Sequence, residues 1–482
     1  MEAFENTYSN MRKGWLLRTF IFLCLLIFAY WALVSVTPLL PTLELEENLR
    51  DASLLLENES EFWMPFGHMP TMDNHSDAIM LNIIGVLDPK EPIRSAMRMS
   101  VSYYPNKANN PIQNFKDFTE GKKMATWSYA RYWHGGIVFL RPMLSIITLG
   151  EVRKILFFCL MILFSIAIIL LTRRTNWVIA LGFAVSMTFG GFPLLAFCIT
   201  YAGVFIIALV VMCSILHLNI RDEESLVKLF LLSGSLTTFI GFGGMSAPVI
   251  TFMFPVLSIL LPDLEMKSFR WDWHYVRRLF LFGVVWSAGY LLTWGSKWVL
   301  SDIILGEGLI VNEAINNILS HTGNAHNMSL FDRLLAIVKN IYTMCPFSMW
   351  SGGGEGKAHT IYAIIRSLPD MEGSLLTRFG IILNEVSHLL PASLLLGFVV
   401  TALFIIVYLI IIFYLAIDSK KRRIIGALGY FSLGFLFLVP YFWYFVTASH
   451  AEMHYWFTFR NQISSLWLFL VFPHIMKKAG DI

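Results

Sequence analysis

The feature of this sequence that most constrains its fold is a series of long apolar segments that recur along almost the whole chain. Because about 20 apolar residues in an α-helix cross a hydrocarbon core ~30 Å thick, each such segment predicts a membrane-spanning helix. Of the 482 residues, 56% are hydrophobic and only 14% are charged, against roughly 25% charged in a soluble domain. The sequence therefore predicts an all-α polytopic membrane protein with about ten or eleven transmembrane helices.

Ten predicted crossings follow from apolar runs that are bounded by polar or charged residues. They lie near residues 19–40, 155–171, 177–191, 193–216, 226–243, 247–261, 279–305, 388–417, 424–447 and 457–475. The stretch 132–149 is apolar enough to be an eleventh crossing or a re-entrant segment.

Lysine and arginine residues in the short connections predict the orientation, because cytoplasmic loops are enriched in them. With ten crossings these basic residues all fall on one side, so both termini are predicted to be cytoplasmic. The residues are Arg12, Lys13, Arg18, Arg173, Arg174, Arg221, Lys228, Lys267, Arg270, Arg277, Arg278, Lys420 to Arg423, Lys477 and Lys478. The first apolar segment is too long for a signal-peptide core and no small-residue cleavage site follows it, which predicts a retained anchor.

This topology places two long loops on the outer face. Connections of such length usually carry function, and the aromatic residues of the first loop predict folded, interfacial helices. The predicted parts are 1–40 (cytoplasmic N-terminus and first transmembrane helix), 41–154 (large outer loop, candidate catalytic region), 155–305 (transmembrane helices), 306–387 (second outer loop, candidate acceptor or sugar-binding region) and 388–482 (C-terminal transmembrane helices with a short outer loop, 448–456).

Composition excludes some classes of function. The five cysteines have no paired spacing, so no disulfide or metal framework is indicated. A net charge of +3 is too small to favour a nucleic-acid partner, and none is expected.

Two carboxylates stand at the start of an apolar run in "MPTMDNHSDAIMLN", residues 69–82. Asp73 and Asp77 are four residues apart, which on a helix places them on one face, where mutual repulsion raises the proton affinity of one of them. Asp77 borders the apolar run directly, and partial desolvation there favours a general base. We therefore predict Asp77 as a catalytic base with Asp73 as its neighbour; the alternative is a solvated turn.

Cations and aromatic residues alternate in "WSYARYWHGGIVFLRPML", residues 127–144. Arg131, His134 and Arg141 lie within apolar sequence, where a cation requires an anionic partner, and guanidinium groups bind phosphate well. These three residues are predicted to bind a donor phosphate. The alternative is that their side chains reach the lipid headgroups without a specific ligand.

A second group of cations lies in "SHAEMHYWFTFRNQ", residues 449–462. His450 and His454 have the i, i+4 spacing of metal ligands on a helix, but the order of residues differs from that of metalloprotease helices. We favour a phosphate or substrate site made by His450, His454 and Arg460. A zinc site and simple interfacial packing are the alternatives.

The second outer loop contains "NEAINNILSHTGNAHNMS" (312–329) and "WSGGGEGKAHT" (350–360), in which polar, aromatic and glycine residues alternate. Such compositions suit a sugar-binding surface, although glycine runs are equally typical of flexible turns. Glu313 and Glu355, with Trp127 and Trp133 of the first loop, are the predicted acceptor or sugar-binding residues.

The organisation of the whole chain resembles the GT-C fold, the integral membrane glycosyltransferases that use polyprenyl-phosphate sugars. The shared features are a large outer loop after the first span, acidic residues and a tryptophan within it, and an Arg-Pro-Leu-like stretch returning to the membrane, here Asp73, Asp77, Trp127 and 141–144. The chain differs from several members in having no adjacent acidic pair.

The resemblance implies a reaction. A carboxylate takes the proton of an acceptor hydroxyl, which attacks the anomeric carbon with inversion while arginine and histidine hold the departing polyprenyl phosphate. The acceptor would be a cell-envelope glycan, lipid or polymer. No cofactor is required, a divalent metal is optional, and membrane lipids surround the site. The expected location is the bacterial cytoplasmic membrane, with the active site facing outward.

Three other functions are compatible with the sequence. A polysaccharide polymerase or ligase would use related chemistry, although in such proteins the large outer loop tends to come late in the chain. A lipid or glycan transporter requires a charged residue within the membrane, and Lys297 is the clear candidate in the central spans. A histidine-dependent membrane acyltransferase would depend on the cluster around His450 and His454 alone.

Overall fold

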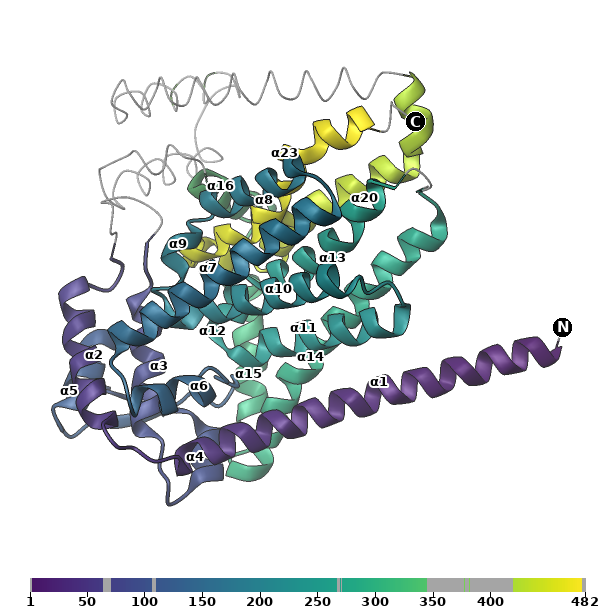
Figure 1. The fold of residues 1–482 in the computed structure, drawn as a ribbon. Coiled ribbons are helices and arrows are strands. Elements are labelled where there is room, and N and C mark those ends of the chain that lie inside the picture. The colour runs from purple at the N-terminus through teal and green to yellow at the C-terminus, as the bar shows by residue number, and fades with distance from the viewer. Residues whose placement is uncertain are drawn as a thin grey trace.

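The computed structural model describes residues 2–63, 71–105, 110–266, 269, 271–344, 377, 381 and 419–478. In this part of the chain, long helices run alongside one another, and the helices of the first predicted outer loop gather at one end of them (Figure 1). The chain is thus a helical membrane protein, as the apolar runs predict.

Five helices are long and apolar enough to cross a membrane among the described residues. A helix rises 1.5 Å per residue, so helices of about 20 residues span the hydrocarbon core. The five are α1 (Glu2–Val36), α7 (Leu149–Arg174), α10 (Ile199–Leu218), α14 (Trp273–Leu305) and α20 (Ser419–Val446). Each coincides with a predicted crossing.

Four further helices occupy predicted crossings but are shorter or less apolar. They are α8 (Trp177–Phe189), α11 (Glu223–Ile240), α13 (Pro248–Leu264) and α23 (Ile463–Lys478). The predicted crossing 388–417 lies outside the described residues. In the stretch 132–149 the structure has only α6 (Ile137–Leu144), whose eight residues are too few to cross a membrane.

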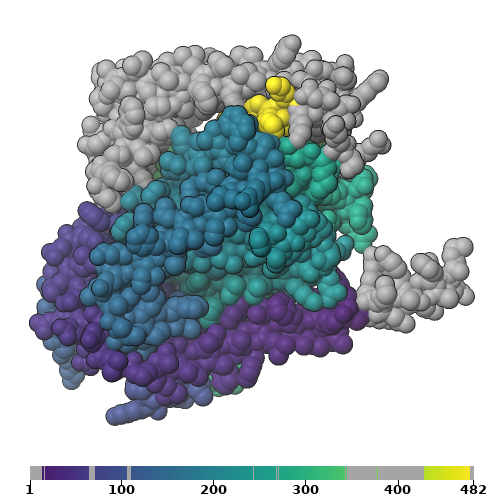
Figure 2. Space-filling model, viewed as in Figure 1, coloured from purple at the N-terminus to yellow at the C-terminus, as the bar shows by residue number. Residues whose placement is uncertain are grey.

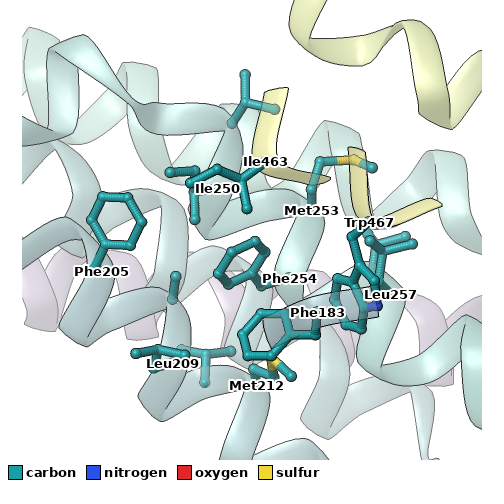
Figure 3. Close-up of a cluster of buried hydrophobic side chains, with 14 of the residues drawn as sticks. Phe183, Phe205, Leu209, Met212, Ile250, Met253, Phe254, Leu257, Ile463 and Trp467 are labelled. Carbon is teal, nitrogen blue, oxygen red and sulfur yellow. The ribbon is translucent and has the colours of Figure 1, made fainter. Parts of the chain in front are cut away.

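An aromatic core joins α8, α10, α13 and α23 (Figure 3). The ring of Phe183 on α8 lies 4.8 Å from that of Trp467 on α23 and 5.4 Å from that of Phe254 on α13, centroid to centroid. The indole Nε1 of Trp467 donates to the carbonyl oxygen of Ile179 at 3.0 Å. The later helices are therefore packed on the early ones.

Helices α11 and α14 pack so closely that glycines of each helix lie against the backbone of the other. A Cβ atom on Gly234 would clash with the carbonyl oxygen of Trp286, and one on Gly289 would clash with that of Leu231. The hydroxyls of Ser235 and Thr293 lie 2.7 Å apart across the same interface. Small residues that allow close approach, with a polar contact between helices, are typical of packing within membranes.

The first predicted outer loop is folded, as its aromatic content indicates, and its own core is continuous with part of α1 and α7. Its short helices lie at the end of the bundle opposite the N-terminus (Figure 1), where purple and blue atoms form one end of the molecule (Figure 2). They are α2 (Leu45–Glu59), α3 (Asn74–Val86), α4 (Pro92–Arg98), α5 (Pro111–Thr119) and α6.

The structure also has a small β-sheet within this loop, which the predicted all-α fold does not include. Strands β1 (Ser100–Tyr103) and β2 (Ala125–Ser128) pair antiparallel, with Val101 opposite Trp127. Val, Tyr, Thr and Trp favour strands, but four-residue strands are too short to be distinguished by pattern alone.

A segment of the second predicted outer loop meets the first loop at the same end. Arg98 pairs with Glu307 at 2.5 Å, and Asn317 donates to the Tyr132 hydroxyl at 2.8 Å. The remaining short elements are η1 (Thr37–Leu39), α9 (Phe192–Leu195), α12 (Phe242–Ser246), α15 (Ile310–His321), η2 (Asn324–His326), α16 (Leu330–Met344), α21 (Ala448–Met453), α22 (Tyr455–Thr458) and η4 (Phe459–Gln462).

The predicted cytoplasmic connections also contact one another, through their basic residues. Arg221 pairs with Asp263 at 2.8 Å, Arg278 donates to the carbonyl oxygen of Arg221 at 2.5 Å, and Arg18 lies 3.7 Å from Glu224. The structure thus separates a basic end from the end that carries the long loops, which agrees with the arrangement expected for opposite sides of a membrane.

Cysteine labelling in intact cells tests the predicted topology. In a background without the native exposed cysteines, a cysteine replacing exposed Glu91 should react with a membrane-impermeant maleimide, whereas one replacing exposed Glu223 should react only after permeabilisation. Labelling of Glu223→Cys alone in intact cells would reverse the orientation, and equal labelling of both would contradict the separation of the two ends across a membrane.

Candidate active site

Asp73 is the N-cap of α3 and faces the later helices. Its Oδ1 accepts from the Ser76 backbone N–H at 2.8 Å and its Oδ2 from the Ser76 hydroxyl at 3.0 Å, which is the usual role of an aspartate at this position. The Oδ2 atom also accepts from the Tyr201 hydroxyl and from the Trp456 indole Nε1, the latter at 3.4 Å. Asp73 is 2% exposed, so these internal donors occupy both of its oxygens.

Asp77 lies one turn further along α3 and caps a different helix. Its two oxygens accept from the backbone N–H groups of Ile199 and Thr200, at 3.1 and 3.0 Å, and the Thr200 hydroxyl donates as well. These N–H groups begin α10 and have no acceptor within that helix, since the first turn of any helix leaves its donors unpaired. Asp77 therefore joins α3 to the start of α10.

Arg153, in the second turn of α7, is the cation of this network. One guanidinium nitrogen bonds both oxygens of Glu59, at 2.9 and 2.8 Å, and the other bonds the Asn74 side-chain oxygen at 3.0 Å and lies 3.8 Å from an Asp77 oxygen. A capping box between Thr148 and Glu151 sets where α7 begins. The arginine thus ties the ends of α2 and α3 to α7.

Burial dominates the protonation of Asp77, which is 0% exposed. Desolvation raises the pKa of its carboxyl from 3.8 to about 6, against the lowering effects of Arg153 and the Thr200 hydrogen bonds. The direction agrees with the desolvation predicted from the sequence. The physical setting is that of a helix cap inside the protein, however, and the role of Asp77 as base stays a prediction.

Arg131 lies in a cage of aromatic rings. Its guanidinium carbon is 5.2, 4.7 and 5.1 Å from the ring centroids of Trp127, Tyr129 and Tyr132. Its carbonyl oxygen accepts from the indoles of Trp294 and Trp298 on α14, at 2.9 Å each, and this fixes the backbone of the cage. The Nε atom is buried and has no hydrogen-bond partner among the described residues.

His134 is fully buried beside this cage. Its ring meets those of Tyr129, Tyr132 and Phe242 edge-on at 5.7, 5.8 and 4.8 Å, and neither ring nitrogen has a partner in the described part of the chain. Its φ of 48° is in the left-handed region, which is uncommon for a histidine. Burial, with Lys297 and Arg131 nearby, holds the pKa of His134 well below its ordinary value, so the ring is neutral.

Three histidines from two predicted outer loops form a cluster. The ring centroids of His321 and His450 are 4.6 Å apart, and those of His450 and His454 are 4.7 Å apart. Both nitrogens of His450 are buried without a partner among described residues. Burial lowers the pKa of His321 to about 4 and that of His450 well below its usual range.

Electrostatic interactions connect the histidine cluster with the other groups. The charge of Arg131 acts on His321, and the Asp73 carboxylate raises the pKa of His454 against a larger lowering by burial. The Trp456 ring, whose indole donates to Asp73, lies 5.2 Å from the His454 ring. The predicted residues Asp73, His454, His450 and Arg131 therefore belong to one region, together with His321.

Two predicted phosphate ligands have other partners. Arg141 is buried on α6 and donates to the carbonyl oxygens of Ile84 and Pro38, at 2.5 and 3.5 Å. Arg460 is buried in η4 and donates to the carbonyl oxygens of Gly190 and Trp456, at 3.0 and 3.1 Å. Backbone carbonyls thus bond two nitrogens of each guanidinium group, while the buried Nε of Arg141 has no partner among the described residues.

The predicted sugar-binding residues are dispersed. Trp127 is exposed on β2 at the edge of the Arg131 cage. Trp133 is fully buried and donates to the Thr293 carbonyl oxygen at 2.7 Å, as a core residue does. Glu313 is exposed on α15, and Glu355 lies outside the described residues.

Two members of the network were not predicted from the sequence. Arg153 stands at the boundary between a loop and an apolar run, where a basic residue is usually taken to mark the membrane surface. His321 lies in the quoted stretch 312–329, but no spacing connects it with His450. Among the described residues no group of three or more His, Cys, Asp or Glu side chains is arranged to hold a metal ion, and the optional metal stays a prediction.

Comparison of the chain with models of protein families, with curated proteins and with solved structures finds no match in any of the three.

Proposed function

We propose that this protein is a membrane glycosyltransferase that moves a sugar from a polyprenyl-phosphate donor to a glycan, lipid or polymer acceptor. The observation that carries the proposal is a set of buried polar nitrogens, on Arg131, His134 and His450, that have no hydrogen-bond partner in the described part of the chain. Buried donors are nearly always paired in folded proteins, and orphaned ones in one region are a common sign of a ligand site.

The chemistry of these groups suits a phosphate. Arg131 supplies a permanent positive charge, and the neutral histidines each supply one N–H donor without a second charge to desolvate. Hydrogen bonds from fixed donors are strong in such a dry environment, and they would stabilise the negative charge that develops on a departing lipid phosphate. Arg141 and Arg460, each of which bonds two backbone carbonyl groups, would position this region.

The acceptor would bind at the surface around the aromatic cage of Arg131. Exposed Trp127 offers a flat apolar face to a sugar ring, and Glu313 is an exposed carboxylate on α15. Inverting transfer also needs a proton acceptor near the N-terminal end of α3. Of the two predicted carboxylates, Asp73 lies next to the histidine cluster through Trp456, whereas Asp77 is directed at α10.

The likeness to the GT-C fold supports the choice of donor. It depends on the order of loops and spans, and the meeting of the long loops at one end is what a shared donor and acceptor site requires. By the same reasoning the protein would sit in a bacterial cytoplasmic membrane with this site outside. Lys297, on which the transporter alternative depends, donates to the carbonyl oxygens of Ala96 and Met97, at 3.1 and 2.9 Å, at the end of α4, and that alternative stays a prediction.

The proposal is tested by incubating the purified protein in nanodiscs with a panel of polyprenyl-phosphate sugars and a mixed glycan acceptor. Release of the free lipid phosphate, with transfer of labelled sugar, is the expected result for at least one donor. Absence of release from every donor, in protein that is folded by its thermal transition, would contradict the proposed activity.

Replacing Arg131 by alanine should weaken donor binding by about 10- to 150-fold, because a hydrogen bond to a charged group contributes roughly 1.5–3 kcal/mol. Binding of the lipid-phosphate donor is measured by titration in nanodiscs. Arg18→Ala, an exposed change at the basic end of the bundle, is the matched control and should leave the affinity unchanged. Equal affinity in Arg131→Ala and wild type would remove Arg131 from the donor site.

A further inference from the structure

A histidine and a glutamate form a close pair at the start of α3, beside the region described above. The Nδ1 atom of His75 lies 2.5 Å from an oxygen of Glu61, and the two side chains are 32% and 37% exposed. The pair is therefore open to solvent, unlike the two aspartates on the same helix. The donor site proposed above uses neither residue.

The pairing fixes which ring nitrogen carries the proton. An ionised carboxylate only accepts hydrogen bonds, so the Nδ1 atom of His75 must be the donor to Glu61. In the neutral ring the Nε2 atom then has a free lone pair, and no described residue is seen to bond to it. A carboxylate that holds a histidine in this tautomer is the arrangement by which many hydrolases orient their general base.

Aromatic contacts place the pair next to Asp73 and His454. The Phe62 ring stacks on the His75 ring at a centroid distance of 6.0 Å and meets the Trp456 ring edge-on at 4.9 Å. Trp456 in turn donates to Asp73 at 3.4 Å and lies against His454. His75 also acts electrostatically on His454, so the two imidazoles are near neighbours.

The carboxylates compare poorly with His75 as direct proton acceptors. A general base must come within hydrogen-bond distance of the hydroxyl that it deprotonates. Asp77 and Asp73 are 0% and 2% exposed, and every one of their oxygens already accepts a hydrogen bond from the protein. Among the described residues, His75 combines exposure with an acceptor atom, Nε2, that no hydrogen bond occupies.

We propose that His75, oriented by Glu61, takes the proton from the acceptor hydroxyl; this inference rests on the proposed function. The hydroxyl oxygen forms a bond to the anomeric carbon as the bond from that carbon to the phosphate oxygen breaks, and its electron pair leaves with the phosphate. The proton passes to Nε2, the resulting imidazolium is paired with Glu61, and solvent later removes the proton. Asp73 and Asp77 hold the helix end that carries the ring.

The test measures sugar transfer by His75→Ala, His75→Gln and Glu61→Gln in nanodiscs. His75→Ala should lose about 10²-fold or more in kcat, and added imidazole should restore part of it. Glu61→Gln should lower kcat while leaving KM within about threefold of wild type, because glutamine no longer fixes the ring with Nε2 as the free acceptor. His274→Ala, which removes an exposed histidine at the start of α14, is the control and should match wild type.

Each result decides between the proposal and a structural role. His75→Ala or His75→Gln with kcat within threefold of wild type would overturn it, and so would a loss that imidazole leaves unchanged together with an unchanged kcat in Glu61→Gln. If His75→Ala fails to fold by its thermal transition, His75→Gln and Glu61→Gln decide. A wild-type protein that transfers no sugar from any donor overturns the proposed function itself, and it is recognised before any variant is made.

Discussion

Replacing Arg153 by methionine is expected to lower the free energy of unfolding by about 3–5 kcal/mol, the usual cost of removing one partner from a buried ion pair. The guanidinium is buried and bonds Glu59 and Asn74 while lying 3.8 Å from Asp77. Methionine fills a similar volume but leaves two carboxylates in a dry environment without their cation. Chemical denaturation in detergent micelles, followed by tryptophan fluorescence, measures the change.

The neighbouring residue provides a matched control for this prediction. Lys154→Met removes a basic residue at the next position of α7, but Lys154 is exposed and should cost less than about 0.5 kcal/mol. Adding Glu59→Gln to Arg153→Met should recover part of the loss, because one of the unpaired charges is then removed. Equal stability of Arg153→Met and Lys154→Met would show that the network contributes little.

Replacing Asp77 by alanine should cost on the order of 3 kcal/mol, because it leaves two backbone N–H groups at the start of α10 without an acceptor. Asp77→Asn should cost less, on the order of 1 kcal/mol, since its side-chain oxygen still accepts from one of them. The same denaturation measurement orders the variants. If alanine and asparagine are equally stable, capping of α10 by Asp77 is energetically unimportant.

Wild type and Asp77→Asn should also differ in the dependence of stability on pH. Because folding raises the pKa of Asp77 from 3.8 to about 6, folding favours the protonated carboxyl. Its contribution to stability is complete below about pH 4 and is lost as the pH rises through about 6. Wild type should therefore lose stability across this window relative to Asp77→Asn, which cannot titrate. Parallel curves for the two proteins would contradict the raised pKa.

Turnover of Asp77→Asn separates the two roles of this residue. As a helix cap, the variant should keep kcat within about tenfold of wild type, whereas loss of a positioned base would cost about 10²-fold or more. Asp73→Asn, compared in the same assay, reports on the carboxylate that faces Trp456. A large loss in Asp77→Asn with full stability would support the base predicted from the sequence.

The overall class of fold could be predicted because long apolar runs have few physical solutions. Helices α1, α7, α10, α14 and α20 occur where hydropathy places them. Hydropathy does not predict where the thirteen-residue α8 and the eight-residue α6 begin and end, since packing against other helices sets their ends. The strands β1 and β2 pair residues that lie 22 or more positions apart in the chain, which local preference cannot specify.

The candidate site could be predicted only in part, because many of its residues contact partners that lie far away in the sequence. Local pattern singled out Asp77, but its partners Ile199 and Thr200 lie 122 and 123 positions away, so its role as a helix cap could not be recognised. The pattern of cationic side chains within apolar sequence places Arg131 and His450 among the candidate-site residues. Arg141 was selected by the same criterion, yet its neighbours are the carbonyl groups of Ile84 and Pro38.

The joining of early and late segments at one end has a consequence for synthesis of the chain. Arg98 pairs with Glu307, 209 positions later, and Asp77 bonds to the start of α10, which is made after α3, α7 and α8. During translation the first 150 residues therefore cannot complete their fold, and their carboxylates stay unpaired, until the later helices have been synthesised. A nascent chain released before residue 199 would present an unfinished surface to proteases, and complete chains would escape them.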